Sequence, residues 1–388
     1  MMPLCAFVLP ILLIACGLAI DLGLMESHAL TMQQAADAAA ASAELELERG
    51  TGNWVAVGKA TAALNGFRDG QGSVKVNVSM VPESGAYAGQ HDAVKVAITD
   101  LVPTIFLRVA NEQAAEVAAS AVAQVPPCVY LMGGNTSVAG VDSTLSLKCP
   151  LYANRGIVLD GNSSIVAMAE NLTGDAGQST GSHMMPTAHF NADALADPLA
   201  AIAEPATGSC GHTSYKQSGG SVTLSPGTYC KGMTLTNAAV TLRPGRYVIT
   251  GGAHWSGSTV QGIGVTLFFT KGTGAAVGQF VIDAKSRVTL LAPLSGSTLN
   301  GMVVFGTRGW TATKNEDFQL LNSTLRADGV WYLPGSGLLL TGSTMNCVHY
   351  FGLEAKTLVM NSSRITGAGD FSSVTTGSPF RPLGGIVQ

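Results

Sequence analysis

Five cysteines beyond residue 100 are the side chains best placed, by type and spacing, to do chemistry. Cys128 and Cys149 are 21 residues apart, Cys210 and Cys230 are 20 apart, and Cys347 has no similarly spaced partner. Such residues form disulfides or bind zinc, but zinc sites are commonly built from Cys-x-x-Cys pairs, and this sequence has none. We therefore predict disulfides, which indicate an oxidising compartment such as the periplasm or the cell surface.

The acidic and histidine residues show no comparable pattern. Cleavage of a polysaccharide needs paired carboxylates or an acidic calcium site, whereas beyond residue 128 only Glu316 and Asp317 are adjacent, and neighbours in a strand face opposite ways. His183 and His189 are six residues apart, which does not suit a shared ligand face. We predict no catalytic, cofactor-binding or metal-binding residues, although stacking could still bring distant acids together.

A pattern that recurs about every twenty residues predicts how most of the chain folds. Residues 321–325, 341–345 and 360–365 each place Asn, Gly, Ser or Thr before an apolar residue, and short Val, Leu and Thr runs lie between such segments. Small residues and Asn suit turns that must stack directly on one another. We expect a mainly β chain with a right-handed parallel β-helix over residues 128–370. A β-sandwich is the alternative.

The same period assigns the cysteine pairs. One coil matches the spacings of 21 and 20, so Cys128–Cys149 and Cys210–Cys230 are each expected to bridge adjacent coils, while Cys347 packs inside as a small apolar residue. Residues 170–215 interrupt the pattern. We interpret them as an excursion containing a short helix over residues 193–203, because insertions between coils commonly bind partners.

The N-terminal sequence predicts a membrane anchor. Residues 1–20 have no charged side chain and are almost wholly apolar, a length that spans a bilayer. We predict a transmembrane anchor over residues 1–25 and a pilin-like helix continuing through residues 26–50, where strong helix formers, above all alanine, dominate. A cleaved signal peptide, or a lipid on Cys16, is the alternative. No lysine or arginine precedes Arg49, so loop charge does not orient the anchor.

The remaining segments and the composition set further limits. Residues 51–125 are expected to form a small α/β domain, with a helix over 54–64 and strands over 73–81 and 93–99. Residues 371–388 are a C-terminal tail. Charged residues make up 12% of the chain and the net charge is −4, which argues against nucleic acid as a partner.

Two N-terminal segments resemble a known family. Residues 17–23 (Gly-Leu-Ala-Ile-Asp-Leu-Gly) and 34–40 (Gln-Ala-Ala-Asp-Ala-Ala-Ala) are similar to the signature of TadE/TadG-like Flp (Tad) pilus-assembly proteins. Residues 102–108 and 222–230 are similar to later parts of such proteins. The resemblance implies a strand over residues 112–124, whose alanine content alone favours a helix. It also implies a single-pass protein of the inner membrane, with its ectodomain in the periplasm or at the cell surface.

We therefore predict a non-enzymatic envelope protein of a Tad-type pilus-assembly system, whose β-helix contacts partners among other pilus-assembly or pilin-like proteins. Its anchor is expected to pack against other helices through the small residues Ala15, Gly17, Ala19 and Gly23. Both a fibre component and a stationary assembly factor fit this prediction. The alternative is a surface adhesin or glycan-binding β-helix, and a polysaccharide lyase or hydrolase is less favoured.

Overall fold

Two separate units make up the fold. A computed structural model describes residues 2–80, 92–133, 136–272, 277–310, 317–380 and 386–387. Unit 1 comprises Met1–Val125 with Leu383–Gln388, and unit 2 comprises Pro126–Pro382. The predicted acid Glu316, residue 81 of the first predicted strand and parts of the predicted tail lie outside the described residues.

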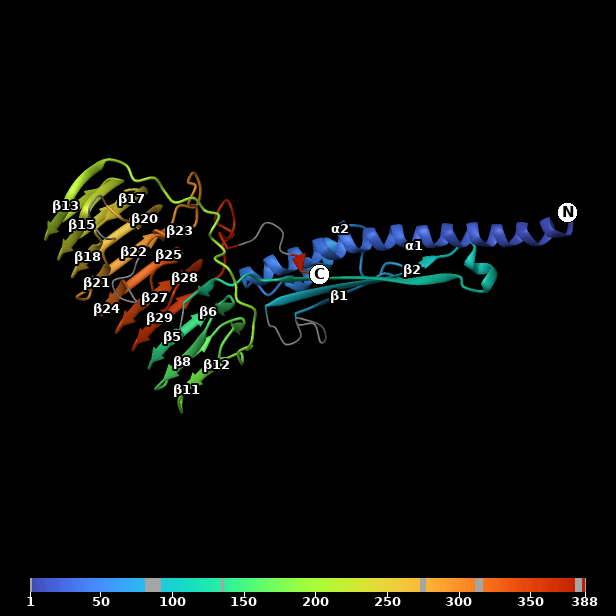
Figure 1. The fold of residues 1–388 in the computed structure, drawn as a ribbon, viewed down its shortest axis with the longest axis horizontal. Helices are drawn as coiled ribbons and strands as arrows, with labels where there is room; N and C mark the ends of the chain where they lie inside the picture. Colours follow the sequence, from blue (N-terminus) through green and yellow to red (C-terminus); the bar gives the residue numbers. More distant parts are fainter. Residues whose placement is uncertain are drawn as a thin grey trace. The chain divides into compact units, whose positions relative to one another are not determined.

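Unit 1 is a long helix packed on a small antiparallel sheet (Figure 1). Helix α1 (Met2–Arg49) buries a face of alanines that includes Ala35, Ala36, Ala39 and Ala40, because small side chains let the helix approach the sheet closely. The other elements are α2 (Trp54–Leu64), β1 (Lys75–Ser79), β2 (Ala93–Pro103), η1 (Leu107–Ala110), β3 (Ala114–Gln124) and β31 (Ile386–Val387). The expected helix over 54–64 is confirmed, and so is the strand expected within 112–124.

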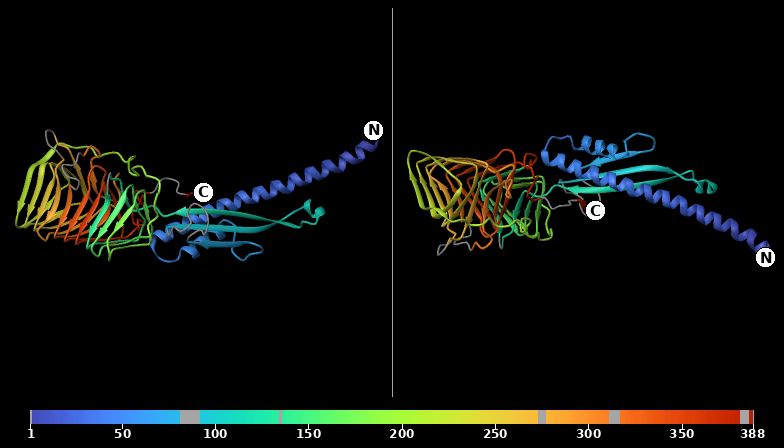
Figure 2. Two further views of the ribbon diagram at one scale, coloured as in Figure 1. Left: turned by 60° about the horizontal axis from the view of Figure 1, so that its bottom comes forward. Right: turned by 90° about the horizontal axis from the view of Figure 1, so that it is seen from above.

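The sheet of unit 1 has the order β1-β2-β3-β31, and every neighbouring pair is antiparallel. Strands β2 and β3 form a long hairpin that runs alongside α1 (Figure 2). Val94, Val96 and Ile98 on β2 alternate with more exposed residues and are buried, as expected for a sheet with one face on a helix.

Unit 2 is a solenoid of parallel strands, which confirms the predicted β-helix. Its strands are β4 (Val129–Leu131), β5 (Thr136–Val141), β6 (Thr144–Leu147), β7 (Leu151–Ala153), β8 (Gly156–Asp160), β9 (Ser164–Val166), β10 (Glu170–Leu172), β11 (Ala176–Gln178), β12 (His183–Met185), β13 (Cys210–Ser218), β14 (Ser221–Leu224), β15 (Gly227–Thr236), β16 (Ala239–Leu242), β17 (Gly245–Thr250), β18 (Ala253–Ser256), β19 (Thr259–Ile263), β20 (Val265–Thr270), β21 (Phe280–Asp283), β22 (Arg287–Leu291), β23 (Met302–Gly306), β24 (Phe318–Leu321), β25 (Thr324–Leu333), β26 (Leu338–Thr341), β27 (Thr344–Cys347), β28 (Phe351–Ala355), β29 (Leu358–Asn361) and β30 (Arg364–Gly367).

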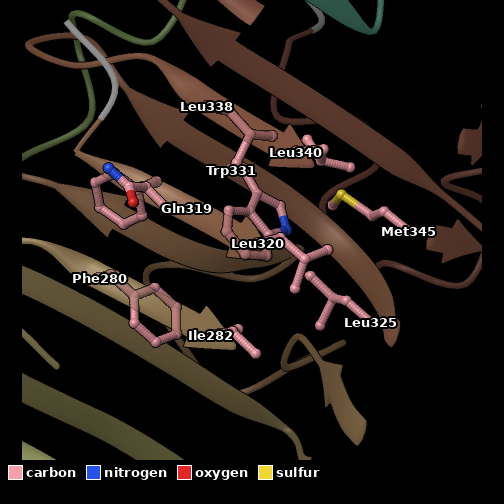
Figure 3. Close-up of a pocket in the computed structure, with 10 residues that line it drawn as sticks. Phe280, Ile282, Gln319, Leu320, Leu325, Trp331, Leu338, Leu340 and Met345 are labelled. Atoms are coloured by element: carbon pink, nitrogen blue, oxygen red, sulfur yellow. The ribbon is translucent and has the colours of Figure 1, made fainter. Parts of the chain in front are cut away.

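The solenoid interior is filled by columns of apolar side chains. Phe318 pairs in register with Phe280 on one side and with Leu338 on the other, and all three are buried. Figure 3 shows this interior around Trp331 and Met345, where side chains from successive coils line one small apolar cavity. Because each coil presents the same inward positions to the next, the core is continuous along the solenoid.

The coils do not stack in sequence order. Strands β28, β29 and β30 pair in parallel with β4, β5 and β6, so the coil at residues 351–367 lies directly on the coil at residues 129–147. Figure 1 shows the red C-terminal strands beside the green early strands. The chain therefore enters the stack in its middle. The coil of β13 and β14 lies at one end, and the coil of β10, β11 and β12 lies at the other.

The predicted excursion over residues 170–215 is partly wrong. Residues 170–185 form a regular coil, because β10, β11 and β12 pair with β7, β8 and β9. The short helix expected over residues 193–203 is also wrong, since this stretch is extended and contains only turns around residues 198–201. Pro198 disfavours a helical backbone at the residue before it. Residues 190–209, which we call the strap, are the true excursion.

Buried serine hydroxyls connect the turns of successive coils. The backbone N–H of Ser323 donates to Oγ of Ser343 (3.1 Å), and the N–H of Ser343 donates to Oγ of Ser363 (3.1 Å). The N–H of Ser363 donates to Oγ of Ser143 (3.1 Å), across the junction between the late and early coils. Each of these hydroxyls donates to a backbone carbonyl two residues earlier in its own coil. We call this set the serine ladder.

Replacing one ladder serine should destabilise the solenoid. Ser343→Ala leaves the buried N–H of Ser323 without its acceptor, so the free energy of unfolding should fall by about 1–3 kcal/mol. Urea unfolding followed by circular dichroism measures the change. The matched control is Thr344→Ala, at the exposed next position of the same turn. Equal effects of the two substitutions would contradict the ladder's role.

Candidate functional site

The cysteines lie where the repeat spacing places them. Cys128 is joined to Cys149, with Cα atoms 5.8 Å apart, and Cys210 is joined to Cys230, with Cα atoms 5.7 Å apart. Cys347 is a buried free thiol inside the solenoid. Burial comes first and the Asp328 carboxylate second in raising the pKa of that thiol well above its ordinary value, so Cys347 is poorly suited to act as a nucleophile.

Breaking the second disulfide should weaken the solenoid. The Cys210–Cys230 bridge closes a loop of 20 residues, so Cys210→Ser/Cys230→Ser should lower the free energy of unfolding by about 3 kcal/mol. Denaturant unfolding of the oxidised proteins measures this loss. In a reducing buffer the difference between wild type and variant should shrink. A variant as stable as the oxidised wild type would contradict the expectation.

Polar contacts hold the strap on the outside of the solenoid. The amide of Asn154 donates to the carbonyl of Leu195 (2.7 Å) and accepts from its N–H (2.9 Å). Further along the strap, the Nη2 atom of Arg308 donates to the carbonyls of Leu199 and Ile202, both at 2.8 Å. These contacts satisfy backbone groups of an extended segment that has no strand partner of its own.

The strap covers a cluster of charged and phenolic groups, which we call the acid cluster: Asp197, Arg308, Tyr332 and Glu354. Tyr332 donates a hydrogen bond to Asp197 (2.7 Å), and the guanidinium of Arg308 lies 5.2 Å from the Tyr332 ring centre and 3.9 Å from Asp197. Glu354 is fully buried and faces the Asp197 carboxylate. Neither carboxyl oxygen of Glu354 has a hydrogen-bond partner in the described part of the chain, whereas the Asp197 side chain is 25% exposed.

Burial dominates the electrostatics of the acid cluster. Removal from water, and then the neighbouring Asp197 carboxylate, raise the pKa of Glu354 to about 9. Burial and the hydrogen bond to Asp197 also raise the pKa of the Tyr332 phenol. Glu354 is therefore protonated at neutral pH. Asp197 belongs to the strap, accepts a hydrogen bond from Tyr332 and lies 3.9 Å from Arg308, so we interpret the cluster as a latch that holds the strap on the solenoid.

The pH dependence of stability should report this latch. Glu354 has an ordinary pKa near 4.5 when unfolded and about 9 when folded, so the native state binds the extra proton between these values. The stabilisation is complete below pH 4.5 and is lost as pH rises through 9. The thermal midpoint of wild type should therefore fall from pH 5 to pH 9.

Two variants test the assignment. Glu354→Gln should flatten the pH dependence of the thermal midpoint, because the amide does not titrate. Glu170 is the matched control: it is also buried, and burial raises its pKa to about 8, but it lies on β10, at the end of the solenoid. Glu170→Gln should remove a separate part of the slope. An unchanged slope in Glu354→Gln would contradict the assignment.

Two histidine–aspartate pairs lie elsewhere on the solenoid. Nδ1 of His349 is 2.8 Å from Asp328, and Nε2 of His254 is 2.9 Å from Asp283. His254 and Asp283 line an open polar groove together with Lys231. Within the described ranges, no group of three or more His, Cys, Asp or Glu side chains could hold a metal ion. His183, which begins β12, and His189 are not among these pairs.

In unit 1, one acidic side chain holds the end of the β2–β3 hairpin on α1. The Asp21 carboxylate accepts backbone hydrogen bonds from Ile105 (2.9 Å), Phe106 (2.9 Å) and Leu107 (2.7 Å). One turn earlier on α1, a Cβ added at Gly17 would lie 2.6 Å from the Phe106 ring. We call these contacts the Asp21 clamp. They explain the Gly-x-x-x-Asp spacing within residues 17–23.

The four residues predicted to pack against other helices fall in two environments. Gly17 is buried beneath Phe106 of its own chain, whereas Ala15, Ala19 and Gly23 are exposed on α1. Exposed small residues leave room for the close approach of a second helix.

A solenoid that follows a long N-terminal helix with its own clamped hairpin defines the class of this protein: a repeat protein with a separate N-terminal unit built on one long helix. Residues 1–57 match the family described as "Putative Flp pilus-assembly TadE/G-like". This match confirms the resemblance seen in residues 17–23 and 34–40. It covers α1 and the start of α2 and does not reach the solenoid. No curated protein and no solved structure matches the chain.

The structure also bears on the predicted anchor. Among the helices in the described part of the chain, none is both long and apolar enough to cross a membrane.

Proposed function

We propose that this chain is a non-enzymatic envelope protein of a Tad-type (Flp) pilus-assembly system. The observation that carries the proposal is the match of residues 1–57 to the pilus-assembly family, which covers α1 and includes Gly17 and Asp21, the helix residues of the Asp21 clamp. The structure of unit 1 supports the proposal because both sequence segments have a role in it. Residues 17–23 hold the hairpin through the clamp, and residues 34–40 form the alanine face that packs on the sheet.

We further propose that α1 anchors the protein in the inner membrane as a single pass. The support is the sequence: residues 1–20 have no charged side chain, and 17–25 apolar residues are enough to span a bilayer. The ectodomain then lies in the periplasm or at the cell surface. The two disulfides of unit 2 support this location, since such bonds persist in oxidising compartments.

The solenoid is proposed to contact pilus-assembly or pilin-like partners. Parallel β-helices present long rigid faces, and the strap adds an irregular surface of the kind that often binds other proteins. A non-enzymatic role is supported by the acid cluster, whose Glu354 carboxyl is fully buried. Glycan binding remains the second candidate, because the open polar groove of Lys231, His254 and Asp283 could accept hydroxyl groups.

Deletion of the gene followed by electron microscopy tests the assembly role. We expect cells without the gene to lose surface pili and to regain them when wild type is restored. Restoration with Asp21→Ala should fail or yield few pili, because the clamp loses all three acceptor bonds. Glu26→Ala, an exposed acid five residues further along α1, is the matched control and should restore pili.

Immunoblots must show equal amounts of each variant. Normal pili in the deleted strain would contradict the assembly role. Glycan binding by the polar groove would then be the favoured function.

A further inference from the structure

The end of the β2–β3 hairpin carries apolar side chains that point into solvent. Ile105 is 57% exposed and Phe106 is 43% exposed, and Leu101 and Pro103 at the end of β2 are exposed as well. A hairpin end in water is normally built from Gly, Asn, Asp, Ser or Pro, because these residues suit turns and hydration. Residues 104–108 read Thr-Ile-Phe-Leu-Arg instead. This composition calls for an apolar neighbour.

The adjoining part of α1 is apolar and exposed as well. Leu18, Leu22 and Leu24 are all exposed, and Leu24 lines one open groove together with Ile105 and Arg108. Leu24 and Ile105 thus share one largely apolar surface within unit 1, whose lining also includes His28 and Thr104. Surfaces of this kind on a soluble monomer mark sites of protein or membrane contact.

The only acidic or basic side chain in residues 1–25 is removed from that surface. Asp21 is 1% exposed, and its two oxygens are taken by three backbone N–H groups of the hairpin. An unpaired carboxylate in an apolar environment is costly, whereas one that accepts several hydrogen bonds is tolerated. The clamp therefore does two things at once: it positions Ile105 and Phe106, and it hides the charge that would oppose an apolar surrounding.

Arg108 marks the polar limit of the surface. It is exposed, it lines the groove beside Ile105, and it follows the apolar residues directly in sequence. A guanidinium at the edge of an apolar patch suits lipid phosphates, and long basic side chains extend to the headgroups from just inside the interface. The apolar residues Ile105 and Phe106 followed by the basic residue Arg108 match the change from acyl chains to headgroups at a lipid surface.

We propose that the hairpin end, residues 104–108, is a second membrane contact of this protein. Ile105 and Phe106 enter the boundary between headgroups and acyl chains beside α1, and Arg108 binds lipid phosphate. The inference rests on the proposed anchoring of α1. A lipid surface is favoured over a second copy of the chain because the exposed apolar residues of α1 continue into residues 1–20, which have no charged side chain.

Lipid quenching of a site-specific fluorophore tests the proposal on the full-length protein. The chain is reconstituted in vesicles of phosphatidylethanolamine and phosphatidylglycerol whose acyl chains are brominated near the headgroup. Ile105→Cys carries the fluorophore in a Cys5→Ser/Cys16→Ser background, where Cys347 is buried and does not react. The matched control is Leu64→Cys in the same background, because Leu64 is 87% exposed at the end of α2. A third protein, Cys5→Ser, carries the fluorophore on the native, exposed Cys16 of α1.

We expect brominated lipid to reduce the fluorescence at position 105 about as much as at Cys16, and to leave position 64 unchanged. Quenching at Cys16 without quenching at 105 would overturn the hairpin contact and leave the anchor intact. No quenching at either position would refute the anchoring itself, and the inference with it. Efficient disulfide crosslinking of Ile105→Cys between copies, without lipid quenching, would overturn the proposal in favour of a protein interface.

Discussion

The hydrogen bond from a backbone N–H to the serine hydroxyl of the next coil sets the geometry on which the solenoid depends. It forms only if every turn has the same shape, and the residue before the ladder serine supplies that shape through a left-handed backbone, as at Asn322 (φ 46°) and Gly342 (φ 57°). Gly342 also leaves room for the Asn322 side chain of the neighbouring coil. A Cβ added at Gly342 would lie only 2.4 Å from Oδ1 of Asn322. An Asn above a Gly therefore stacks where two Asn residues would collide.

Identical turns have a consequence for the order of coils. Because the turns at Ser363 and Ser143 match, the coil at residues 351–367 stacks on that at residues 129–147, and the chain enters the solenoid in the middle of the stack. The early coils, up to β10, β11 and β12, extend to one end of the solenoid, and β13 begins at the other end. The strap is the connection that this order requires. It places Asp197 beside Glu354, so the buried acid cluster is a product of the stacking order.

The features that were predictable from the amino-acid sequence are those with local or periodic causes. The twenty-residue period of residues 321–325 and 341–345 predicts both the solenoid and the spacing of Cys210 and Cys230. The stacking order was not predictable, because the turns at Ser143 and Ser363 carry equivalent residues and nothing distinguishes the right neighbour. The acid cluster was not predictable either, because the stacking order is what brings residues 197 and 354 together. The sequence gives one local indication of it, a lone Glu in the apolar strand β28.

Two of the buried carboxyl groups, Asp21 and Glu354, are accommodated in physically different ways. Asp21 meets three backbone donors, which are fixed by the hairpin and do not titrate, so its contact is set by the fold of unit 1 alone. Glu354 instead meets another carboxylate, and its burial is tolerated because it holds a proton. A change of external pH should therefore act on the strap of unit 2 through Glu354.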